Sequence, residues 1–322
     1  MNRKALIVQS IDRAGIDLLQ SAGLKVVLLP EPTKKSLLEQ VEGCDAILVR
    51  TAPITRQVIE AGSRLKVIAR HGVGMDNVDM RAATEHGIVV VNTPEANAES
   101  VAEHVVGLML ALAKNLLKAD RALRADRFEV RHTYIGIDLS GKTLGIIGMG
   151  RIGSAVARKA VHGFNMTVLG YDPYLTPDRV PESITLTDDL NALLQSSDFI
   201  SIHSPLTQET RGLIGERELG RMRPTAYLIN AARGGIVNER ALIRTLQQRT
   251  IAGAALDVYE AEPPSPDNPL FAMENVVVTP HMASHTREAL IRMATHAAEG
   301  IVEVLRGDRP HYPVNPEVLD RE

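Results

Sequence analysis

The stretch Leu144-Gly-Ile-Ile-Gly148-Met-Gly150-Arg-Ile-Gly153 decides the fold, because an apolar run ends in three spaced glycines and a helix-like run follows. Gly148 permits a tight turn, Gly150 lets the backbone approach a pyrophosphate, and Gly153 lets the helix pack closely on the strand. The amino end of that helix would offer N–H groups and a positive dipole end to phosphates. The stretch therefore predicts a dinucleotide-binding βαβ unit.

An acidic residue follows at the expected distance. Asp172 lies nineteen residues beyond Gly153, at the end of the next strand-like run, in Tyr171-Asp172-Pro173. A carboxylate at this place accepts hydrogen bonds from the two adenosine ribose hydroxyls and repels a 2′-phosphate. Asp172 therefore predicts that the cofactor is NAD rather than NADP.

The rest of the chain repeats the alternation of strand and helix. Continuous apolar runs separated by helices are typical of parallel sheets covered on both faces. We read the chain as α/β with two doubly wound parallel-sheet domains. The expected strands are residues 5–8, 25–29, 46–49, 67–69 and 88–91 in the first half, and 143–147, 166–171, 199–202, 226–230, 252–256 and 276–278 in the second.

Two long helices are expected to join the domains. Ser100 and Glu103 have the spacing of a capping box, and apolar residues follow at helical intervals over 101–117. The second helix is expected over 285–306, and it stops at Gly307. The tail that follows, 309–316, contains three prolines and is not expected to be helical.

Composition excludes several classes of protein. The 322 residues are 44% hydrophobic and 23% charged with a net charge of −3, as expected for a folded chain without the strong basic excess of a nucleic-acid binder. A single cysteine, Cys44, excludes an intrachain disulfide and fits a cytoplasmic protein. The most apolar stretch, 101–117, is interrupted by charges and is too short for a membrane span.

Three polar residues end predicted strands of the second half: Arg233, Glu262 and His281. In an open parallel sheet, ligands bind at the carboxyl ends of the strands, so these three side chains point toward the ligand. They supply a cation for a carboxylate, an imidazole that carries a proton, and a carboxylate that orients the imidazole. Position alone does not decide between Glu262 and the nearby Glu260.

Several motifs together resemble the D-isomer-specific 2-hydroxyacid dehydrogenase family, and within it most closely the D-3-phosphoglycerate dehydrogenases. The matching stretches cover the chain from near Arg50 to near Arg306. They are residues 72–79 (GVGMDNVD), 97–104 (NAESVAEH), 143–153, 203–207 (HSPLT), 230–239, 254–263 and 279–289.

The resemblance implies a Rossmann NAD-binding domain, residues 99–288, inserted into a flavodoxin-like substrate domain made of residues 1–98 and 289–322. It implies that Arg233, Glu262 and His281 are catalytic, which selects Glu262 over Glu260. It implies substrate contacts at Arg50, Thr51, Val73, Gly74 and Arg233. The cofactor contacts that it implies are Gly148, Gly150, Arg151, Ile152, Gly153, Asp172, His203, Ser204, Pro205, Ala231, Ala232, Arg233, Asp257, His281, Ala283 and Ser284.

The expected reaction is hydride transfer between NAD(H) and a D-2-hydroxy acid or 2-oxo acid, with 3-phosphoglycerate, the substrate that begins serine biosynthesis, as the first candidate. The expected assembly is a homodimer, joined through the long helix and the 128–136 loop. A glyoxylate or hydroxypyruvate reductase, a phosphite-oxidising relative and a non-catalytic NAD-sensing corepressor remain alternatives. Formate dehydrogenases pair the histidine with glutamine, and Glu262 argues against them.

Two residues depart from the family pattern. His285 follows the catalytic histidine where relatives have small residues, and His71 precedes the glycine motif where a small residue is common. His281 and His285 have the spacing of a metal-binding pair, but no third ligand is evident, and no metal is expected. Only sixteen residues follow Arg306, so no regulatory domain is expected.

Overall fold

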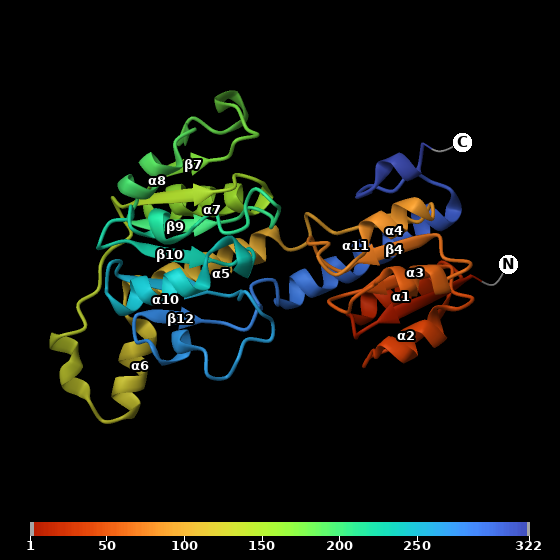
Figure 1. Cartoon of the computed structure of the whole chain (residues 1–322), viewed down its shortest axis with the longest axis horizontal. Helices are drawn as coiled ribbons and strands as arrows, with labels where there is room; N and C mark the ends of the chain where they lie inside the picture. The colour runs from red at the N-terminus through yellow and green to blue at the C-terminus, as the bar shows by residue number, and fades with distance from the viewer. Residues whose placement is uncertain (1–2, 321–322) are drawn as a thin grey trace. The chain divides into compact units, whose positions relative to one another are not determined.

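A computed structural model describes residues 3–320 of the chain. The chain forms two compact units (Figure 1). Unit 1 comprises residues 1–97 and 285–322, and unit 2 comprises residues 98–284. The sequence placed these divisions after residues 98 and 288.

Unit 1 is built on a five-stranded sheet in which every neighbouring pair is parallel. The strand order is β2-β1-β3-β4-β5. The chain therefore adds β2 on one side of β1 and then β3, β4 and β5 on the other side, so the order of the strands reverses between β1 and β3. The strands are β1 (Lys4–Val8), β2 (Lys25–Leu29), β3 (Ala46–Val49), β4 (Val67–Arg70) and β5 (Val89–Val91). The helices are α1 (Arg13–Ser21), α2 (Lys34–Val41), α3 (Arg56–Ala61), α4 (Met80–Glu85), α11 (Arg287–Arg306) and the 3-10 turn η5 (Pro316–Val318).

Unit 2 is built on a seven-stranded parallel sheet of order β12-β11-β10-β9-β6-β7-β8. Its strands are β6 (Thr143–Ile147), β7 (Thr167–Tyr171), β8 (Ile184–Thr187), β9 (Phe199–Ile202), β10 (Tyr227–Asn230), β11 (Gly253–Leu256) and β12 (Val276–Val278). Its α-helices are α5 (Ala98–Ala113), α6 (Leu116–Arg124), α7 (Arg151–Phe164), α8 (Leu190–Ser196), α9 (Glu216–Leu219) and α10 (Glu239–Gln247). Short 3-10 turns add η1 (Phe128–His132), η2 (Pro177–Arg179), η3 (Gly234–Ile236) and η4 (Pro269–Ala272). The order from β8 to β12 is that of a Rossmann sheet with one further strand, which confirms the predicted fold class.

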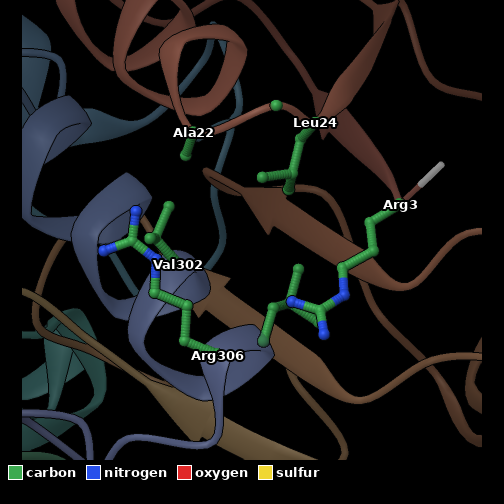
Figure 2. A pocket seen from close by; sticks show the side chains of 7 residues that line it. Arg3, Ala22, Leu24, Val302 and Arg306 are labelled. Atoms are coloured by element: carbon green, nitrogen blue, oxygen red, sulfur yellow. The ribbon is translucent and has the colours of Figure 1, made fainter. Parts of the chain in front are cut away.

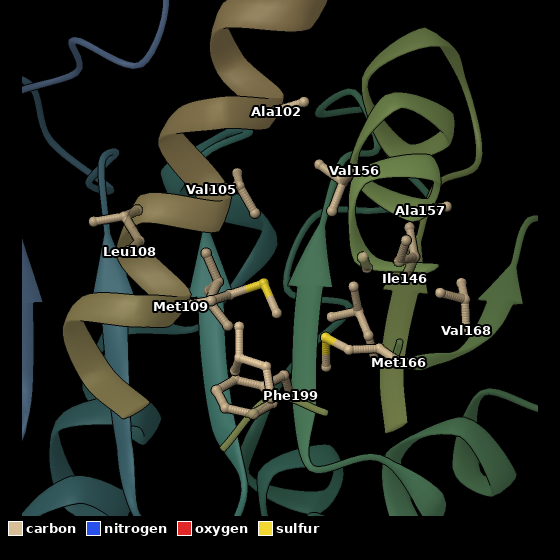
Figure 3. Packing of buried hydrophobic residues seen from close by; sticks show 14 of the residues in the cluster. Ala102, Val105, Leu108, Met109, Ile146, Val156, Ala157, Met166, Val168 and Phe199 are labelled. Atoms are coloured by element: carbon tan, nitrogen blue, oxygen red, sulfur yellow. The ribbon is translucent and has the colours of Figure 1, made fainter. Parts of the chain in front are cut away.

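The core of unit 2 explains why its strands are continuous apolar runs. Helices α5 and α7 pack side by side over one face of the sheet, and Met109 and Val156 reach toward strand residues such as Phe199 (Figure 3). Phe199 is fully buried, and its ring stacks on Tyr227 with centroids 5.3 Å apart. All four residues of β9 are buried and three of them are apolar, as expected for a strand of a parallel sheet that is covered on both faces.

The expected helix over 101–117 is wrong at both ends. The helix α5 begins at Ala98, so Ser100 lies within it and is buried rather than capping it. It ends at Ala113 because Asn115 adopts a left-handed conformation (φ 52°), which asparagine tolerates better than most residues. The next helix, α6, then runs at an angle of 60° to α5. The sequence also missed β8, a four-residue edge strand with a single buried side chain.

No single helix among residues 3–320 is long and apolar enough to cross a membrane, and only the bent pair of α5 and α6 passes that test of length and composition when taken together.

In unit 1, a depression of about 400 Å³ is lined by Arg3, Leu24, Val302, Arg306 and neighbours (Figure 2). It lies at the amino end of β1, whereas the predicted site residues of this unit follow the carboxyl ends of β3 and β4. This depression is therefore separate from the predicted substrate contacts.

Candidate active site

The glycine loop of unit 2 has the shape that a dinucleotide needs. Gly148 adopts a positive φ of 92°, and a Cβ there would lie 2.7 Å from the amide nitrogen of Ser204. At Gly153, a Cβ would lie 2.0 Å from the carbonyl oxygen of Gly148, so only glycine lets α7 begin this close to β6. At Gly150, a Cβ would meet nothing within 4 Å, which leaves open space at the amino end of α7. The residues present therefore fit a pyrophosphate at this helix end.

Asp172 lies beside this loop at the end of β7. Its two oxygens accept hydrogen bonds from the backbone N–H groups of Met149 and Tyr174, each at 3.0 Å. These bonds hold the carboxylate next to the glycine loop, where the sequence placed the ribose contact.

The residues after β9 complete this edge of the glycine loop. His203 and Ser204 lie against Gly148, and the His203 ring pairs with the Ser201 hydroxyl at 2.8 Å. Burial lowers the pKa of His203 to about 3, so this imidazole is neutral.

His281 and Glu262 form the central pair of the site. The His281 Nδ1 lies 2.7 Å from the Glu262 Oε2, and the second carboxylate oxygen accepts from the N–H of Tyr259 at 3.1 Å. Burial by itself raises the pKa of Glu262, but the hydrogen bond and charge of His281, the Tyr259 N–H and the charge of Arg233 together hold it below its usual value. Glu262 is therefore a carboxylate at neutral pH. The His281 side chain is 46% exposed, so its other ring nitrogen is accessible to a ligand.

The loop that carries Glu262 is fixed by its neighbours. Glu260, the alternative that the sequence left open, accepts instead from the N–H of Glu239 at 2.9 Å, where α10 begins. The Tyr259 hydroxyl donates to the carbonyl oxygen of Thr279 at 3.0 Å, which ties the Glu262 loop to the segment before His281. Tyr259 is thus a positioning residue that sequence reasoning missed.

Arg233 follows β10 on a loop that passes very close to the Tyr259 backbone. A Cβ at Gly234 would lie 2.0 Å from the Tyr259 carbonyl, so a glycine is required for this approach. The buried Asn230 side chain holds the loop, since its Oδ1 accepts from the N–H of Ala232 and its Nδ2 donates to the carbonyl of Arg233. The guanidinium donates to the Ala232 carbonyl at 2.7 Å. Its charge lies close enough to Glu262 to contribute to the lowered pKa of that carboxyl.

Asp257 shapes the turn that presents His281. The carboxylate is fully buried and accepts from the Thr279 hydroxyl at 2.6 Å and from the N–H groups of Met282 and Ala283 at 2.9 Å each. His281 has a positive φ of 49° between these anchors. His104, from α5, lies 3.2 Å from the Thr279 hydroxyl and 3.7 Å from Asp257. The predicted cofactor contact of Asp257 stays a prediction, and its observed bonds all serve the turn.

The remaining predicted residues lie in unit 1. Val73 and Gly74 follow β4 on a loop held by a hydrogen bond from Asn92 to the Val73 carbonyl. Within the described residues, neither the N–H of Val73 nor that of Gly74 donates to a protein acceptor. Both amides are therefore available to an anion. Arg50 and Thr51 follow β3, and the Thr51 hydroxyl accepts from the side chain of Gln9 at 2.9 Å.

The structure thus brings together in unit 2 the predicted catalytic residues and the predicted cofactor loops after β6, β7, β9, β10, β11 and β12. It keeps Arg50, Thr51, Val73 and Gly74 together in unit 1. His281 and His285, weighed as a metal pair, have different partners: Glu262 holds His281, and Arg50 lies against His285. Among residues 3–320, no group of three or more His, Cys, Asp and Glu side chains is gathered as in a metal site.

Comparison with known proteins gives the chain a family. The model of the NAD-binding domain of D-isomer-specific 2-hydroxyacid dehydrogenases matches residues 106–283. The chain is 44% identical over 99% of its length to a D-3-phosphoglycerate dehydrogenase of Methanocaldococcus jannaschii, of which it covers 60%. It is also 44% identical over 89% of its length to a glyoxylate reductase of Korarchaeum cryptofilum, of which it covers 88%. A crystal structure of a Thermus thermophilus protein, 36% identical, covers 97% of this chain and 99% of its own with a TM-score of 0.90.

Proposed function

This chain belongs to the D-isomer-specific 2-hydroxyacid dehydrogenase family, and on that premise we propose that it transfers a hydride between NAD(H) and a small D-2-hydroxy acid or 2-oxo acid. The observation that carries the proposal is the 2.7 Å contact between His281 and Glu262, on the loops after β12 and β11, at the same edge of the parallel sheet as the glycine loop after β6. The chain spans about three fifths of the length of the first curated relatives, 60% and 58%. Activity, substrate and assembly are therefore our proposals for this chain.

The chain's own residues supply binding and a proton. The nicotinamide cofactor, when bound, donates or accepts the hydride at the substrate's second carbon. During reduction, the His281 Nε2 donates a proton to the carbonyl oxygen, and during oxidation it accepts the proton of the hydroxyl. Glu262, bonded to Nδ1, keeps a proton on that nitrogen and stabilises the imidazolium. Arg233 binds the substrate carboxylate and polarises the carbonyl through charge-assisted hydrogen bonds.

The cofactor that we propose is NAD rather than NADP. A second phosphate on the ribose would lie against the Asp172 carboxylate, which two backbone N–H groups hold in place beside the glycine loop. The family model that matches this region is that of an NAD-binding domain. The repulsion between two anions in one partly buried site favours NADH.

We propose 3-phosphoglycerate and 3-phosphohydroxypyruvate as the substrate pair, with Arg50 on the phosphate and the Val73 and Gly74 amides on the carboxylate. Several relatives over nearly the whole chain carry the name D-3-phosphoglycerate dehydrogenase. A second candidate, glyoxylate or hydroxypyruvate reduction, has support from relatives named glyoxylate reductase, of which the chain covers 88% and 95%. The two candidates differ in the charge of the substrate tail.

We also propose a homodimer joined through the arm formed by α6 and η1. The arm is seen in Figure 1 as α6, η1 and the turn that follows. Within the described residues, this arm exposes large apolar side chains. They are Leu116, Leu117, Leu123, Phe128 and Ile135, with exposed fractions of 52%, 42%, 60%, 65% and 81%. Apolar surface of this kind marks an interface, and a two-fold axis would bury it against its own copy. Sedimentation of a monomer at micromolar concentration contradicts this proposal.

The experiment that tests the proposed function is a panel of 2-oxo acids followed by NADH absorbance. The panel contains 3-phosphohydroxypyruvate, hydroxypyruvate, glyoxylate and pyruvate, each with NADH and with NADPH. We expect turnover with NADH, the highest kcat/KM for the phosphorylated acid, and a loss for Arg50→Ala that is largest on that acid. Efficient turnover of glyoxylate without an Arg50 effect would favour the second candidate, and no turnover of any acid would refute the proposal.

A further inference from the structure

Unit 1 places a histidine against the arginine that we assign to the substrate tail. Ser10 follows β1 and Arg50 follows β3, the two strands between which the order of the sheet reverses, where open α/β sheets bind ligands. The Arg50 Nη1 donates to the Ser10 carbonyl at 3.0 Å, and its Nη2 lies 3.2 Å from the His285 Nε2. The guanidinium is therefore held between a backbone carbonyl and an imidazole.

The contact between Arg50 and His285 defines the protonation of the histidine. A guanidinium has only donors, so the Nε2 of His285 must be the acceptor and carries no proton. The imidazole is then neutral, with its proton on Nδ1. If Nε2 were protonated, two N–H donors would face each other at 3.2 Å, and the contact would be repulsive. An oxyanion lying between the two side chains removes this conflict, because it accepts from both.

The other charged groups near this place do not take that role. His71 follows β4, is 3% exposed, and has a pKa lowered to about 4 by burial first and then by the charges of Arg50 and Arg70. It therefore stays neutral at physiological pH. Arg70 donates to the backbone carbonyl of His71. On its own segment, His285 is followed by two exposed charged residues of opposite sign, Arg287 and Glu288.

The backbone around Arg50 is also fixed, so the contact is a built feature of the loop. Gln9 adopts a positive φ of 74°, and its Oε1 accepts from the N–H groups of Thr51 and Ala52 at 2.7 and 2.9 Å. Asn77 donates to the carbonyl oxygens of Arg50 and Ala52 at 3.2 and 2.8 Å. Side-chain hydrogen bonds thus tie the segment 50–52 to Gln9, which follows β1, and to Asn77, which lies between β4 and α4.

We propose that His285 is a specificity-determining residue that takes up one proton when an oxyanion binds to Arg50. The proposal rests on the proposed function, since it assigns this position to the substrate tail. In the free protein His285 accepts from Arg50, and in the complex it donates from Nε2 to the anion, with the proton taken from solvent. The site therefore prefers a phosphate, sulfonate or carboxylate tail over a neutral one, and this preference grows as the pH falls.

The test uses inorganic sulfate, whose charge does not change over the range in which histidine titrates. Sulfate binding is measured by thermal denaturation shifts from about pH 6 to about pH 8, and by competition with the 2-oxo acid wherever turnover occurs. The proteins are the wild type, His285→Asn, and the matched control His86→Asn, which removes an exposed histidine at the end of α4 in the same unit.

We expect sulfate affinity of the wild type and of His86→Asn to rise as the pH falls, by up to about tenfold per unit, the limit for one proton taken up with each anion. In His285→Asn the pH dependence should be lost, while the affinity near pH 8 changes by less than about threefold because Arg50 remains. Equal pH dependence in the wild type and His285→Asn overturns the proposal, and so does the absence of sulfate binding. Because the shift assay needs no turnover, failure of the proposed dehydrogenase activity would show separately in the 2-oxo acid panel.

Discussion

Acidification should destabilise unit 1, and His71 should account for a defined part of the loss. In the folded protein the pKa of His71 is about 4 instead of 6.5, with burial as the largest cause. Between these two values the unfolded chain binds a proton at His71 that the folded protein does not bind. Its contribution to stability is therefore full above pH 6.5 and falls as the pH decreases toward 4. At pH 5 the loss is about 2 kcal/mol relative to pH 8.

The assay compares urea unfolding of the wild type and His71→Asn at pH 8 and pH 5. The chain has no tryptophan, so far-UV circular dichroism is the suitable signal. The two units can unfold in separate transitions. The transition of unit 1 is identified at pH 8 as the one whose urea midpoint is shifted by His71→Asn. We expect the fall in unfolding free energy between pH 8 and pH 5 to be smaller in the variant by about 2 kcal/mol. The exposed His86, replaced by Asn, serves as the control and should not change the fall. The same fall in His71→Asn and the wild type would refute the reasoning.

Three further predictions concern unit 2. In Gly153→Ala, the new Cβ lies 2.0 Å from the Gly148 carbonyl oxygen, so the glycine loop must shift. NADH affinity, measured by fluorescence, should fall about ten- to hundredfold, as for overpacking by about 1–3 kcal/mol. An unchanged NADH affinity contradicts this prediction. Asp172→Ala should narrow the preference for NADH over NADPH in kcat/KM, since the carboxylate that repels the 2′-phosphate is gone; a preference equal to that of the wild type would count against its assignment. Glu262→Gln should lower kcat for 2-oxo acid reduction, because the amide holds the Nδ1 proton of His281 less strongly than a carboxylate does; an unchanged kcat argues against the pairing.

Much of the fold could be predicted because parallel sheets bury both faces of each strand. Runs such as residues 143–147 and 199–202 are mostly apolar, with one hydroxyl residue each, and they are strands β6 and β9 in the structure. The edge strand β8 was missed for the opposite reason, since it buries only Ile184 and alternates with threonine. The end of α5 was missed because Asn115 carries a local backbone preference that the apolar pattern on either side conceals.

The site could be predicted less completely. Strand ends and glycine spacing place Arg233, His281 and the dinucleotide loop from the sequence alone. The choice of Glu262 over Glu260 needed the family resemblance, because the two carboxylates are only two residues apart in the sequence. Which of them faces His281 depends on the conformation of their loop, which Tyr259 fixes. The positive φ of His281 depends on a buried carboxylate, Asp257, twenty-four residues earlier in the chain. No local pattern contains such a contact.

The most direct test of the central claim is single-turnover reduction of the preferred 2-oxo acid by NADH in the wild type and in His281→Ala. NADH binding is measured by fluorescence on the same samples. The variant should lose on the order of 10²-fold or more in the rate of reduction, as for a lost general acid, while its NADH affinity stays near that of the wild type. Reduction by His281→Ala at the wild-type rate, with NADH bound normally, would contradict the assignment of the proton donor and with it the proposed chemistry of this site.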